Sequence, residues 1–352
     1  MIKVLIVDDS AFVRKFLTEE LDKQPDITVV GTAMNPYIAR EKIVELEPDV
    51  LTLDLEMPRM DGLSFLSKLM KYRPMPVVVV SSLTPKNSQN ALNALQLGAV
   101  DVICKPGSAY STQNISKDII RAVRTASVAR PNKQVMVKTS QVESHSRTGN
   151  LKLVHTTNKL IAIGSSTGGT RALEAILPNL PANLPGIVIV QHMPPVFTKS
   201  FADRLDTICS MNIKEAEDGD RVETGKVLIA PGNYHMLIEK SGASYYAKIK
   251  TGPPVHHQRP SVDVMFNSVA NNVGVNAMGV ILTGMGADGA QGLLNMKNSG
   301  AYTIAQDEKT SVVYGMPKEA NKLGAAEAIL PLHDMAGAIV EHMKKQLKQP
   351  TA

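Results

Sequence analysis

The sequence has no tryptophan, only two cysteines and no long apolar run, and each shortage excludes a class of protein. Cys104 and Cys209 stand far apart, with no Cys-x-x-Cys pair and no Cys/His cluster, so neither a disulfide framework nor a zinc site is predicted. No stretch approaches the roughly 18 uninterrupted apolar residues that a membrane-spanning helix needs, so membrane insertion is not expected. Because the N-terminus MIKVLIVDD has an acidic pair where a secretion signal is still apolar, we expect a cytoplasmic protein.

The sequence also lacks a basic region outside one segment. Its formal net charge is +5, and residues 124–152 hold six basic side chains against the single acid Glu143. This segment accounts for the whole excess, so a nucleic-acid-binding domain is not predicted. Residues 124–156 show no apolar periodicity and are rich in Ser, Thr, Asn and Gln, so we interpret them as a basic flexible linker. The rest of the 352 residues divides into two domains and a tail, at 1–123, 157–347 and 348–352.

Apolar strand-like runs alternate five times with amphipathic helical patterns in the N-terminal domain. The runs are rich in β-branched residues, as the buried strands of parallel sheets are. Such alternation is typical of an α/β fold with a (βα)5 parallel sheet. The five runs are KVLIVDD, ITVVGTA, DVLTLDLEMP, PVVVVSSL and VDVICKP.

Polar side chains lie at the predicted ends of four of these strands. Parallel α/β sheets bind ligands beyond the carboxyl ends of their strands. Carboxylates gathered there repel one another unless they share a hard cation, and Mg²⁺ prefers such oxygen ligands. Asp54 can then act as a nucleophile toward phosphorus, whereas helix capping is the alternative for any one acid alone. The polar residues are Asp8, Asp9, Asp54, Ser81 and Lys105.

The segment from about residue 2 to residue 128 resembles a response-regulator receiver domain. The matching motifs, in order, are the DD pair, the acceptor in LDLEMPRMDG, the hydroxyl in SS and the KP dipeptide. The resemblance implies that Asp54 accepts a phosphoryl group from a histidine kinase and that Val102 stands where some receivers carry an aromatic switch residue. It also implies Mg²⁺ ligands and signal-transmitting residues, which are respectively Asp8, Asp9 and Asp54, and Ser81 and Lys105.

Strand-like runs resume after the linker. LIAIGSS, GIVIVQHM, AMGVILTG and AYTIAQD are typical of buried strands, and helical patterns follow most of them. Between them, RVETGKVLIAPGNYHMLIEK and SYYAKIK are shorter alternating runs with turn glycines, which predict an antiparallel hairpin excursion. We therefore expect a second, doubly wound α/β domain.

A turn of small residues, Gly164-Ser165-Ser166-Thr167-Gly168, joins the first of these strands to a helical pattern. It fits G-x-S-x-G with Ser166 central, a geometry that lifts a hydroxyl above a sheet and aims backbone N–H groups at a developing oxyanion. A phosphate-binding P-loop is disfavoured because its lysine is missing after Gly169, and GxGxxG is absent. The remaining alternative is that Ser165, Ser166 or Thr167 only caps the helix.

A nucleophilic serine needs a base and an acid that orients the base. His192 directly follows GIVIVQ, so we expect it at the same sheet edge as Ser166. Asp288, in GVILTGMGADGA, is expected there too and would complete a Ser-His-Asp triad in an order unlike that of α/β-hydrolases. Asp263 competes with it, although an acid near Ser261 is better explained as a first-turn helix residue. The other candidate histidines are His235, His256 and His257.

Residues from about 159 to 345 resemble the catalytic domain of the chemotaxis protein-glutamate methylesterase (CheB) family. The matching motifs are IGSSTGG, QHMPPVFT, EDGDRV, IAPGNYHM, GPPVHHQRPSVDVMF, ILTGMGADGA and VVYGMPKEA. The resemblance implies a catalytic triad of Ser166, His192 and Asp288, and it places the backbone near Thr167 and Met285 at the oxyanion. Ser165 stands where alanine is frequent in the family and creates an ambiguity about the attacking hydroxyl, which we resolve in favour of the central Ser166.

The implied reaction is hydrolysis of glutamate γ-methyl esters on methyl-accepting chemotaxis receptors, with release of methanol, and deamidation of selected receptor glutamines. It requires no cofactor, and a chemotaxis histidine kinase would be the phosphodonor of the receiver. A response regulator with a nucleic-acid-binding output is the rival, but the recognition helix or basic face that it needs is not found. Methyl transfer from S-adenosylmethionine is a weaker alternative. We also expect the receiver to cover the catalytic residues until Asp54 is phosphorylated.

Overall fold

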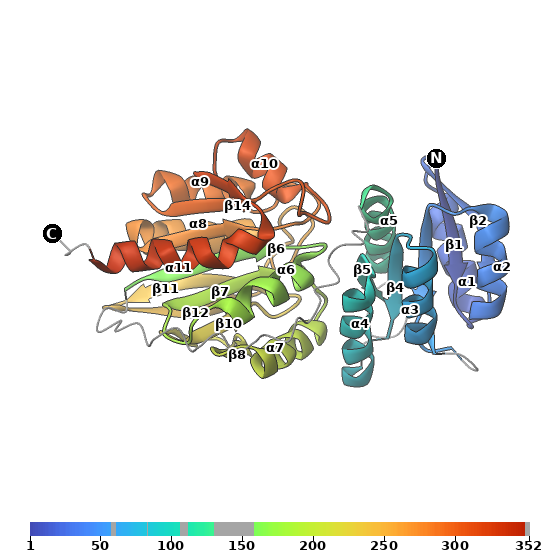
Figure 1. The fold of residues 1–352 in the computed structure, drawn as a ribbon, viewed down its shortest axis with the longest axis horizontal. Coiled ribbons are helices and arrows are strands. Elements are labelled where there is room, and N and C mark those ends of the chain that lie inside the picture. The colour runs from blue at the N-terminus through green and yellow to red at the C-terminus, as the bar shows by residue number, and fades with distance from the viewer. Residues whose placement is uncertain (58–60, 83, 106–111, 130–157, 349–352) are drawn as a thin grey trace. The chain divides into compact units, whose positions relative to one another are not determined.

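The computed structural model describes residues 1–57, 61–82, 84–105, 112–129 and 158–348. The chain divides into two compact units, residues 1–133 and residues 134–352 (Figure 1). The N-terminal unit has a five-stranded sheet, and the C-terminal unit has a seven-stranded and a three-stranded sheet. Among the described helices, none is both long enough and apolar enough to cross a bilayer.

The sheet of the N-terminal unit has the order β2-β1-β3-β4-β5, and every neighbouring pair is parallel. The predicted (βα)5 alternation is therefore confirmed. The strands are β1 Ile2–Val7, β2 Ile27–Ala33, β3 Val50–Asp54, β4 Val77–Ser81 and β5 Asp101–Cys104. The helices are α1 Ala11–Asp22, α2 Pro36–Leu46, α3 Gly62–Tyr72, α4 Pro85–Leu97 and α5 Thr112–Val128.

Local chemistry accounts for where these elements begin and how they are buried. The side chains of Ser10 and Asn35 accept hydrogen bonds from first-turn N–H groups and so cap α1 and α2. Every residue of β3 and β4 is buried, which is why these strands are continuous apolar runs and not alternating ones. Asp54 and Ser81 are the last residues of these two strands, so the sheet itself carries them to its edge.

Helix α5 extends further than the sequence predicted. Residues 124–128, which the prediction gave to the linker, are helical. The helix continues because Ala126 is fully buried and Arg124 pairs with Asp26 at 2.6 Å, contacts with the domain that composition does not reveal. The rest of the predicted linker, residues 130–156, lies outside the described residues.

The C-terminal unit is built on a parallel sheet with the order β15-β14-β13-β6-β7-β10-β8. This confirms the predicted α/β architecture. The strands are β6 Leu160–Ser165, β7 Gly186–Gln191, β8 Asn212–Glu215, β10 Lys226–Ile229, β13 Ala277–Ile281, β14 Tyr302–Gln306 and β15 Ala328–Leu330. The helices are α6 Gly169–Ile176, α7 Phe197–Ile208, α8 Val262–Asn272, α9 Ala290–Asn298, α10 Met316–Lys322 and α11 Leu332–Lys348, with short 3-10 helices η1 Leu177–Asn179 and η2 Gly274–Asn276. Of the predicted tail, Lys348 ends α11 and residues 349–352 lie outside the described residues.

The predicted antiparallel excursion is present as a three-stranded sheet of β9 Arg221–Val222, β11 His235–Ser241 and β12 Ser244–Lys250. The prediction was wrong for β10, which lies in the same stretch of sequence but pairs in parallel with β7 and β8. Val227, Leu228 and Ile229 of β10 are fully buried, so both faces of this strand are apolar, as a central position requires. The short edge strands β8 and β15 were not predicted.

Candidate active site

Three adjacent strands bring the predicted serine, histidine and aspartate to one edge of the seven-stranded sheet. Ser166 follows the last residue of β6, His192 follows the last residue of β7, and Asp288 lies in the loop between β13 and α9. Because β6 lies between β13 and β7 and all three are parallel, their carboxyl ends share this edge. The chain leaves β6 toward β7 and later returns on the other side as β13, so the edge is a topological switch point, where α/β sheets bind ligands.

The turn that carries Ser166 is held by backbone contacts and by two glycines. Ser166 N–H donates to Thr283 O at 3.0 Å, and Ser166 O accepts from Gly169 N–H at 2.7 Å. Gly168 has a left-handed φ of 80°, and a Cβ there would lie 2.6 Å from Cβ of Val312. A Cβ at Gly284 would lie 2.6 Å from Cβ of Ser166, so only a glycine allows the β13 loop to approach the serine this closely.

The hydroxyl of the neighbouring serine, Ser165, already has a hydrogen-bond partner. Ser165 is fully buried, and its hydroxyl donates to Gln191 Oε1 at 2.7 Å. The amide of Gln191 donates in turn to Ser166 O at 3.0 Å and His192 O at 3.1 Å, so this side chain ties the serine turn to the histidine backbone. Helix α6 has Gly168 as its N-cap, with no side-chain cap hydrogen bond, so the helix-cap alternative is not supported. Of the two serines, Ser166 is the one whose hydroxyl is left available.

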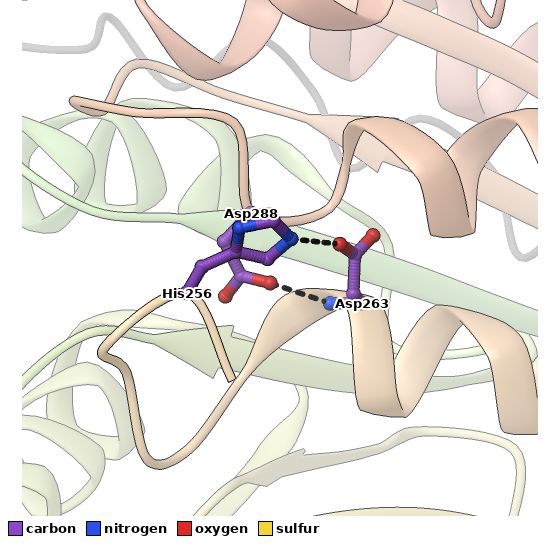
Figure 2. A group of neighbouring side chains, drawn as sticks. All are labelled: His256, Asp263 and Asp288. Atoms are coloured by element: carbon purple, nitrogen blue, oxygen red, sulfur yellow. Dashed lines mark hydrogen bonds and ion pairs between the residues drawn. The ribbon is translucent and has the colours of Figure 1, made fainter. Parts of the chain in front are cut away.

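Asp288, not Asp263, is the acid that contacts His192. Asp288 Oδ2 lies 2.8 Å from His192 Nε2. Asp263 lies in the first turn of α8 behind the N-cap Ser261, as predicted, and its carboxylate contacts His256 Nε2 at 3.0 Å (Figure 2). The structure thus holds two histidine–aspartate pairs side by side. Only the His192–Asp288 pair includes a residue that follows β7, the strand beside the one that leads to Ser166.

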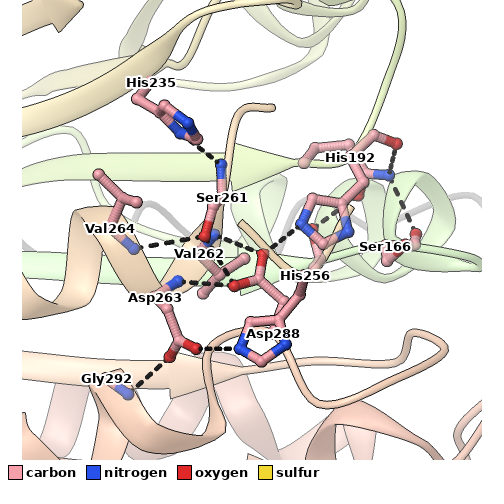
Figure 3. Close-up of polar contacts among 12 residues, drawn as sticks. Ser166, His192, His235, His256, Ser261, Val262, Asp263, Val264, Asp288 and Gly292 are labelled. Atoms are coloured by element: carbon pink, nitrogen blue, oxygen red, sulfur yellow. Dashed lines mark hydrogen bonds and ion pairs between the residues drawn. The ribbon is translucent and has the colours of Figure 1, made fainter. Parts of the chain in front are cut away.

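His192 is arranged as a base should be. Its side chain and that of Asp288 are 3% and 2% exposed, so water does not weaken their contact. Figure 3 shows the two side chains pointing toward each other. The other ring nitrogen of His192, Nδ1, is buried and has no hydrogen-bond partner among the described residues. When Nε2–H donates to Asp288, Nδ1 carries the lone pair that can take a proton. Ser166 Oγ makes no hydrogen bond with His192 Nδ1 in this conformation. Hydrogen bonds between a nucleophile and its base often form only when substrate binds.

The Asp288 carboxylate is held by four donors. Oδ1 accepts from Ser261 Oγ at 2.7 Å and from Asp263 N–H at 3.0 Å, and Oδ2 accepts from Val262 N–H at 2.8 Å as well as from His192. These groups open α8, so the carboxylate lies at a helix N-terminus, which favours negative charge. Burial opposes ionisation, but His192, the backbone N–H and the Ser261 hydroxyl outweigh it and hold the pKa of Asp288 below its ordinary value. The sequence offered no sign of these contacts beyond the cap residue Ser261.

Two backbone N–H groups stand where an oxyanion site was predicted. Thr167 precedes α6, and Met285 lies in the loop after β13. Within the described part of the chain, neither N–H donates to a backbone acceptor. The hydroxyl of Thr283 donates to Thr167 O at 2.9 Å and also contacts Val313 O, which fixes these two loops together. Free N–H groups on a fixed backbone can stabilise a developing negative oxygen.

The remaining candidate histidines make no hydrogen bond or ion pair with Ser166 among the described residues, and two of them have other partners. His235 is buried, accepts from Ser261 N–H through Nδ1 at 3.2 Å and lies 3.0 Å from Pro253 O through Nε2, so both of its ring nitrogens are used. His256 contacts Asp263, and His257 follows it in the same turn. Sequence reasoning missed Gln191 altogether, because an amide at a strand end has no motif that signals a positioning role.

The N-terminal unit gathers its predicted polar residues at the carboxyl edge of its own sheet. Lys105 Nζ lies 2.7 Å from Asp54 Oδ2 and 3.3 Å from Asp8 Oδ2. One carboxylate oxygen from each of Asp8, Asp9 and Asp54 lies within 4.8 Å of the others. The Ser81 hydroxyl is buried and has no hydrogen-bond partner in the described part of the chain. Burial raises the pKa of Asp54 to about 6, and Lys105 offsets part of that rise.

Comparison with known proteins finds relatives of both units. Residues 161–339 match the CheB methylesterase family, and residues 4–115 match the response regulator receiver domain. A relative from Syntrophus aciditrophicus, named protein-glutamate methylesterase/protein-glutamine glutaminase 2, is 58% identical over 341 residues that cover 96% of this chain and 98% of the relative. A relative from Bdellovibrio bacteriovorus named for the same two activities is 51% identical over 345 residues, 97% of this chain and 98% of its own. The crystal structure of the Thermotoga maritima CheB methylesterase catalytic domain covers 53% of this chain and all of its own, with 41% identity and a TM-score of 0.52.

Proposed function

This chain belongs to the CheB methylesterase family, and we propose accordingly that it hydrolyses glutamate γ-methyl esters on chemotaxis receptors and deamidates receptor glutamines. Phosphorylation of its receiver domain regulates this activity. The observation that carries the proposal is the buried His192–Asp288 contact of 2.8 Å at the sheet edge that also carries Ser166.

In the proposed reaction Ser166 Oγ attacks the ester carbonyl while His192 Nδ1 takes the hydroxyl proton. The imidazolium that forms is stabilised by the charge of Asp288. The N–H groups of Thr167 and Met285 stabilise the oxyanion. His192 then gives the proton to the leaving methoxide oxygen, which departs as methanol, or to the leaving amide nitrogen of a glutamine, which departs as ammonia. A water molecule then hydrolyses the acyl-enzyme by the reverse proton path. The unpartnered Nδ1 and the Gln191 contacts that join the two turns support this assignment.

The receiver is proposed to take a phosphoryl group on Asp54 from a chemotaxis histidine kinase. The donor set fits Mg²⁺, because carboxylate oxygens of Asp8, Asp9 and Asp54 converge within 4.8 Å of one another and two of these acids are buried. When bound there, Mg²⁺ supplies positive charge to phosphoryl oxygens. Lys105, which contacts Asp54, and Ser81, whose hydroxyl is unpartnered, are the proposed signal-transmitting residues.

Methyl-accepting receptors are the proposed substrate, and the cytoplasm, where the receiver meets its kinase, is the proposed location. The ester hydrolysis itself uses only groups of this chain and water. No nucleic-acid partner and no membrane insertion form part of the proposal.

Methanol release from methylated receptor membranes tests the proposed function. The full-length protein is assayed with and without a small-molecule phosphodonor, and with and without S-adenosylmethionine. We expect methanol in all cases, more with phosphodonor, and no dependence on S-adenosylmethionine. Absence of methanol under every condition would contradict the esterase, and a requirement for S-adenosylmethionine would point to methyl transfer instead.

A further inference from the structure

A second histidine–aspartate pair lies directly beside the catalytic one. His256 Nε2 and Asp263 Oδ2 are 3.0 Å apart, and one ligand atom from each of His256, Asp263 and Asp288 lies within 4.8 Å of the others (Figure 2). The Asp263 side chain is 7% exposed, whereas that of His256 is 49% exposed. The proposed reaction has no step for either residue.

The turn that presents His256 has an unusual backbone. His256 and His257 both have left-handed φ values, 50° and 62°, and the flanking Val255 and Gln258 exchange two backbone hydrogen bonds of 3.0 and 2.8 Å. A two-residue turn of this kind favours asparagine or glycine, so two histidines there are strained. The contact with Asp263 compensates the strain at His256, and the described residues hold no such partner for His257.

The two aspartates are joined through the ends of two helices. Asp263 N–H donates to Asp288 Oδ1 at 3.0 Å, so Asp288 caps α8. Asp263 Oδ1 accepts from Gly292 N–H at 2.6 Å, so Asp263 caps α9, which has no side-chain bond at its own N-cap. Each acid therefore stabilises the helix next to the other, and the two carboxylates cannot move apart without the loss of a cap.

These contacts disfavour a metal ion as the occupant of the cluster. Each oxygen of Asp288 already accepts two hydrogen bonds. Two neighbouring buried carboxylates still require positive charge, and His256 is the side chain that can provide it.

We propose that His256 and Asp263 are positioning residues that set the electrostatic field of Asp288 and, through it, the protonation of His192. The proposal rests on the proposed esterase function. Asp263 faces the titratable groups Asp288 and His256, while Asp288 faces His192 and Asp263. His235 accepts from Ser261 N–H, and the hydroxyl of Ser261 donates to Asp288. Backbone N–H groups hold the carboxylates of Asp288 and Asp263 in place, and the imidazole of His256 contacts Asp263.

The effect of the neighbouring charges on the pKa of Asp263 supports this role. Burial, and after it the charge of Asp288, raise the pKa of Asp263, while Gly292 N–H and His256 lower it in part. Without His256, the Asp263 carboxylate loses its imidazole partner, and its negative charge beside Asp288 is no longer offset. More negative charge favours the protonated imidazole of His192, which is inactive as a base. Loss of His256 should therefore move the acid limb of the activity profile to higher pH.

A matched pair of variants tests this inference on the full-length protein. His256→Asn and His257→Asn remove one imidazole each, and asparagine tolerates the left-handed backbone at both positions. We expect the acid limb of kcat/KM for methanol release to rise by about half a pH unit in His256→Asn and to stay unchanged in His257→Asn. Adding Asp263→Asn to His256→Asn should reverse the shift, because the amide still accepts from Gly292 N–H but carries no charge.

The controls separate this inference from the proposed function. Methanol release by the unsubstituted protein establishes the esterase, and melting temperatures establish that each variant folds. An acid limb in His256→Asn that matches His257→Asn would overturn the proposal, as would a double variant that keeps the full shift. If His256→Asn fails to fold, Asp263→Asn alone decides, because an acid limb that moves to higher pH in that variant contradicts the assigned direction.

Discussion

Asp288→Asn is the substitution for which the structure gives the sharpest expectation. The carboxylate meets four donors, two at each oxygen, whereas an asparagine offers one oxygen and one N–H₂ group. If the amide nitrogen takes the Oδ1 position, the N–H of Asp263 loses its acceptor. If it takes the Oδ2 position, the N–H of Val262 loses its acceptor, and His192 must turn a lone pair toward the amide. Nδ1 then carries the proton and cannot act as a base.

Both arrangements lower activity, and both lower stability. Loss of the orienting charge, or the wrong imidazole tautomer, lowers kcat by about 10⁴. One buried N–H without an acceptor costs about 1–3 kcal/mol, which corresponds to roughly 2–4 °C of melting temperature per kcal/mol in a unit of this size. Because the pKa of Asp288 is lowered in the folded state, its contribution is present above the ordinary value of about 4 and is lost as the pH falls below it. The difference in the free energy of unfolding between the unsubstituted protein and Asp288→Asn should therefore decrease in acid.

The assay combines methanol release with thermal unfolding at several pH values. Asp263→Asn is the matched control, because it replaces a neighbouring buried carboxylate that does not contact His192, and the amide oxygen still accepts from Gly292 N–H. A folded Asp288→Asn protein that keeps activity within tenfold of the unsubstituted protein would refute the assignment of Asp288 as the orienting acid.

Three further predictions concern the receiver. Asp54→Asn should abolish stimulation by phosphodonor while basal methanol release persists, and stimulation that persists would place the acceptor elsewhere. Because the raised pKa of about 6 means that the ionised Asp54 opposes folding above that pH, Asp54→Asn should also stabilise the receiver at pH 7, by up to about 3 kcal/mol, with the gain absent below about pH 4. If the receiver inhibits the esterase, a fragment that begins at residue 153 should exceed the unphosphorylated full-length protein in initial rate and ignore phosphodonor. A slower fragment would show that the receiver does not inhibit.

The main parts of both sheets were predictable because buried strands of a parallel sheet leave a strong signal. Continuous apolar runs mark β6, β7 and β13, and the polar residue after each run marks the edge where the site lies. Strand β10 escaped this reasoning because turn residues flank it on both sides, which imitates a hairpin. Of the edge strands, β8 carries no continuous apolar run, and β15 is only three residues long.

The candidate site was predictable in its chemically reactive residues and not in those that hold them. Ser166, His192 and Asp288 each follow a predicted strand, so position and chemistry coincide. Gln191 contacts a turn 25 residues earlier in the sequence, and Asp263, the partner of His256, contacts Asp288, 25 residues later. No sequence motif signals these contacts. The N–H groups at the start of α8 that hold the Asp288 carboxylate likewise come close to it only because the helix start meets a distant loop.

The central claim, that the hydroxyl of Ser166 performs the hydrolysis, is tested most directly by methanol release from methylated receptor membranes with Ser166→Ala and Ser165→Ala. Ser165 already donates to Gln191, so its loss removes one buried hydrogen bond and should leave most of the activity. Loss of Ser166 should lower the rate by a factor on the order of 10⁶, as removal of a triad nucleophile does. If Ser165→Ala abolishes methanol release and Ser166→Ala retains it, the account is contradicted.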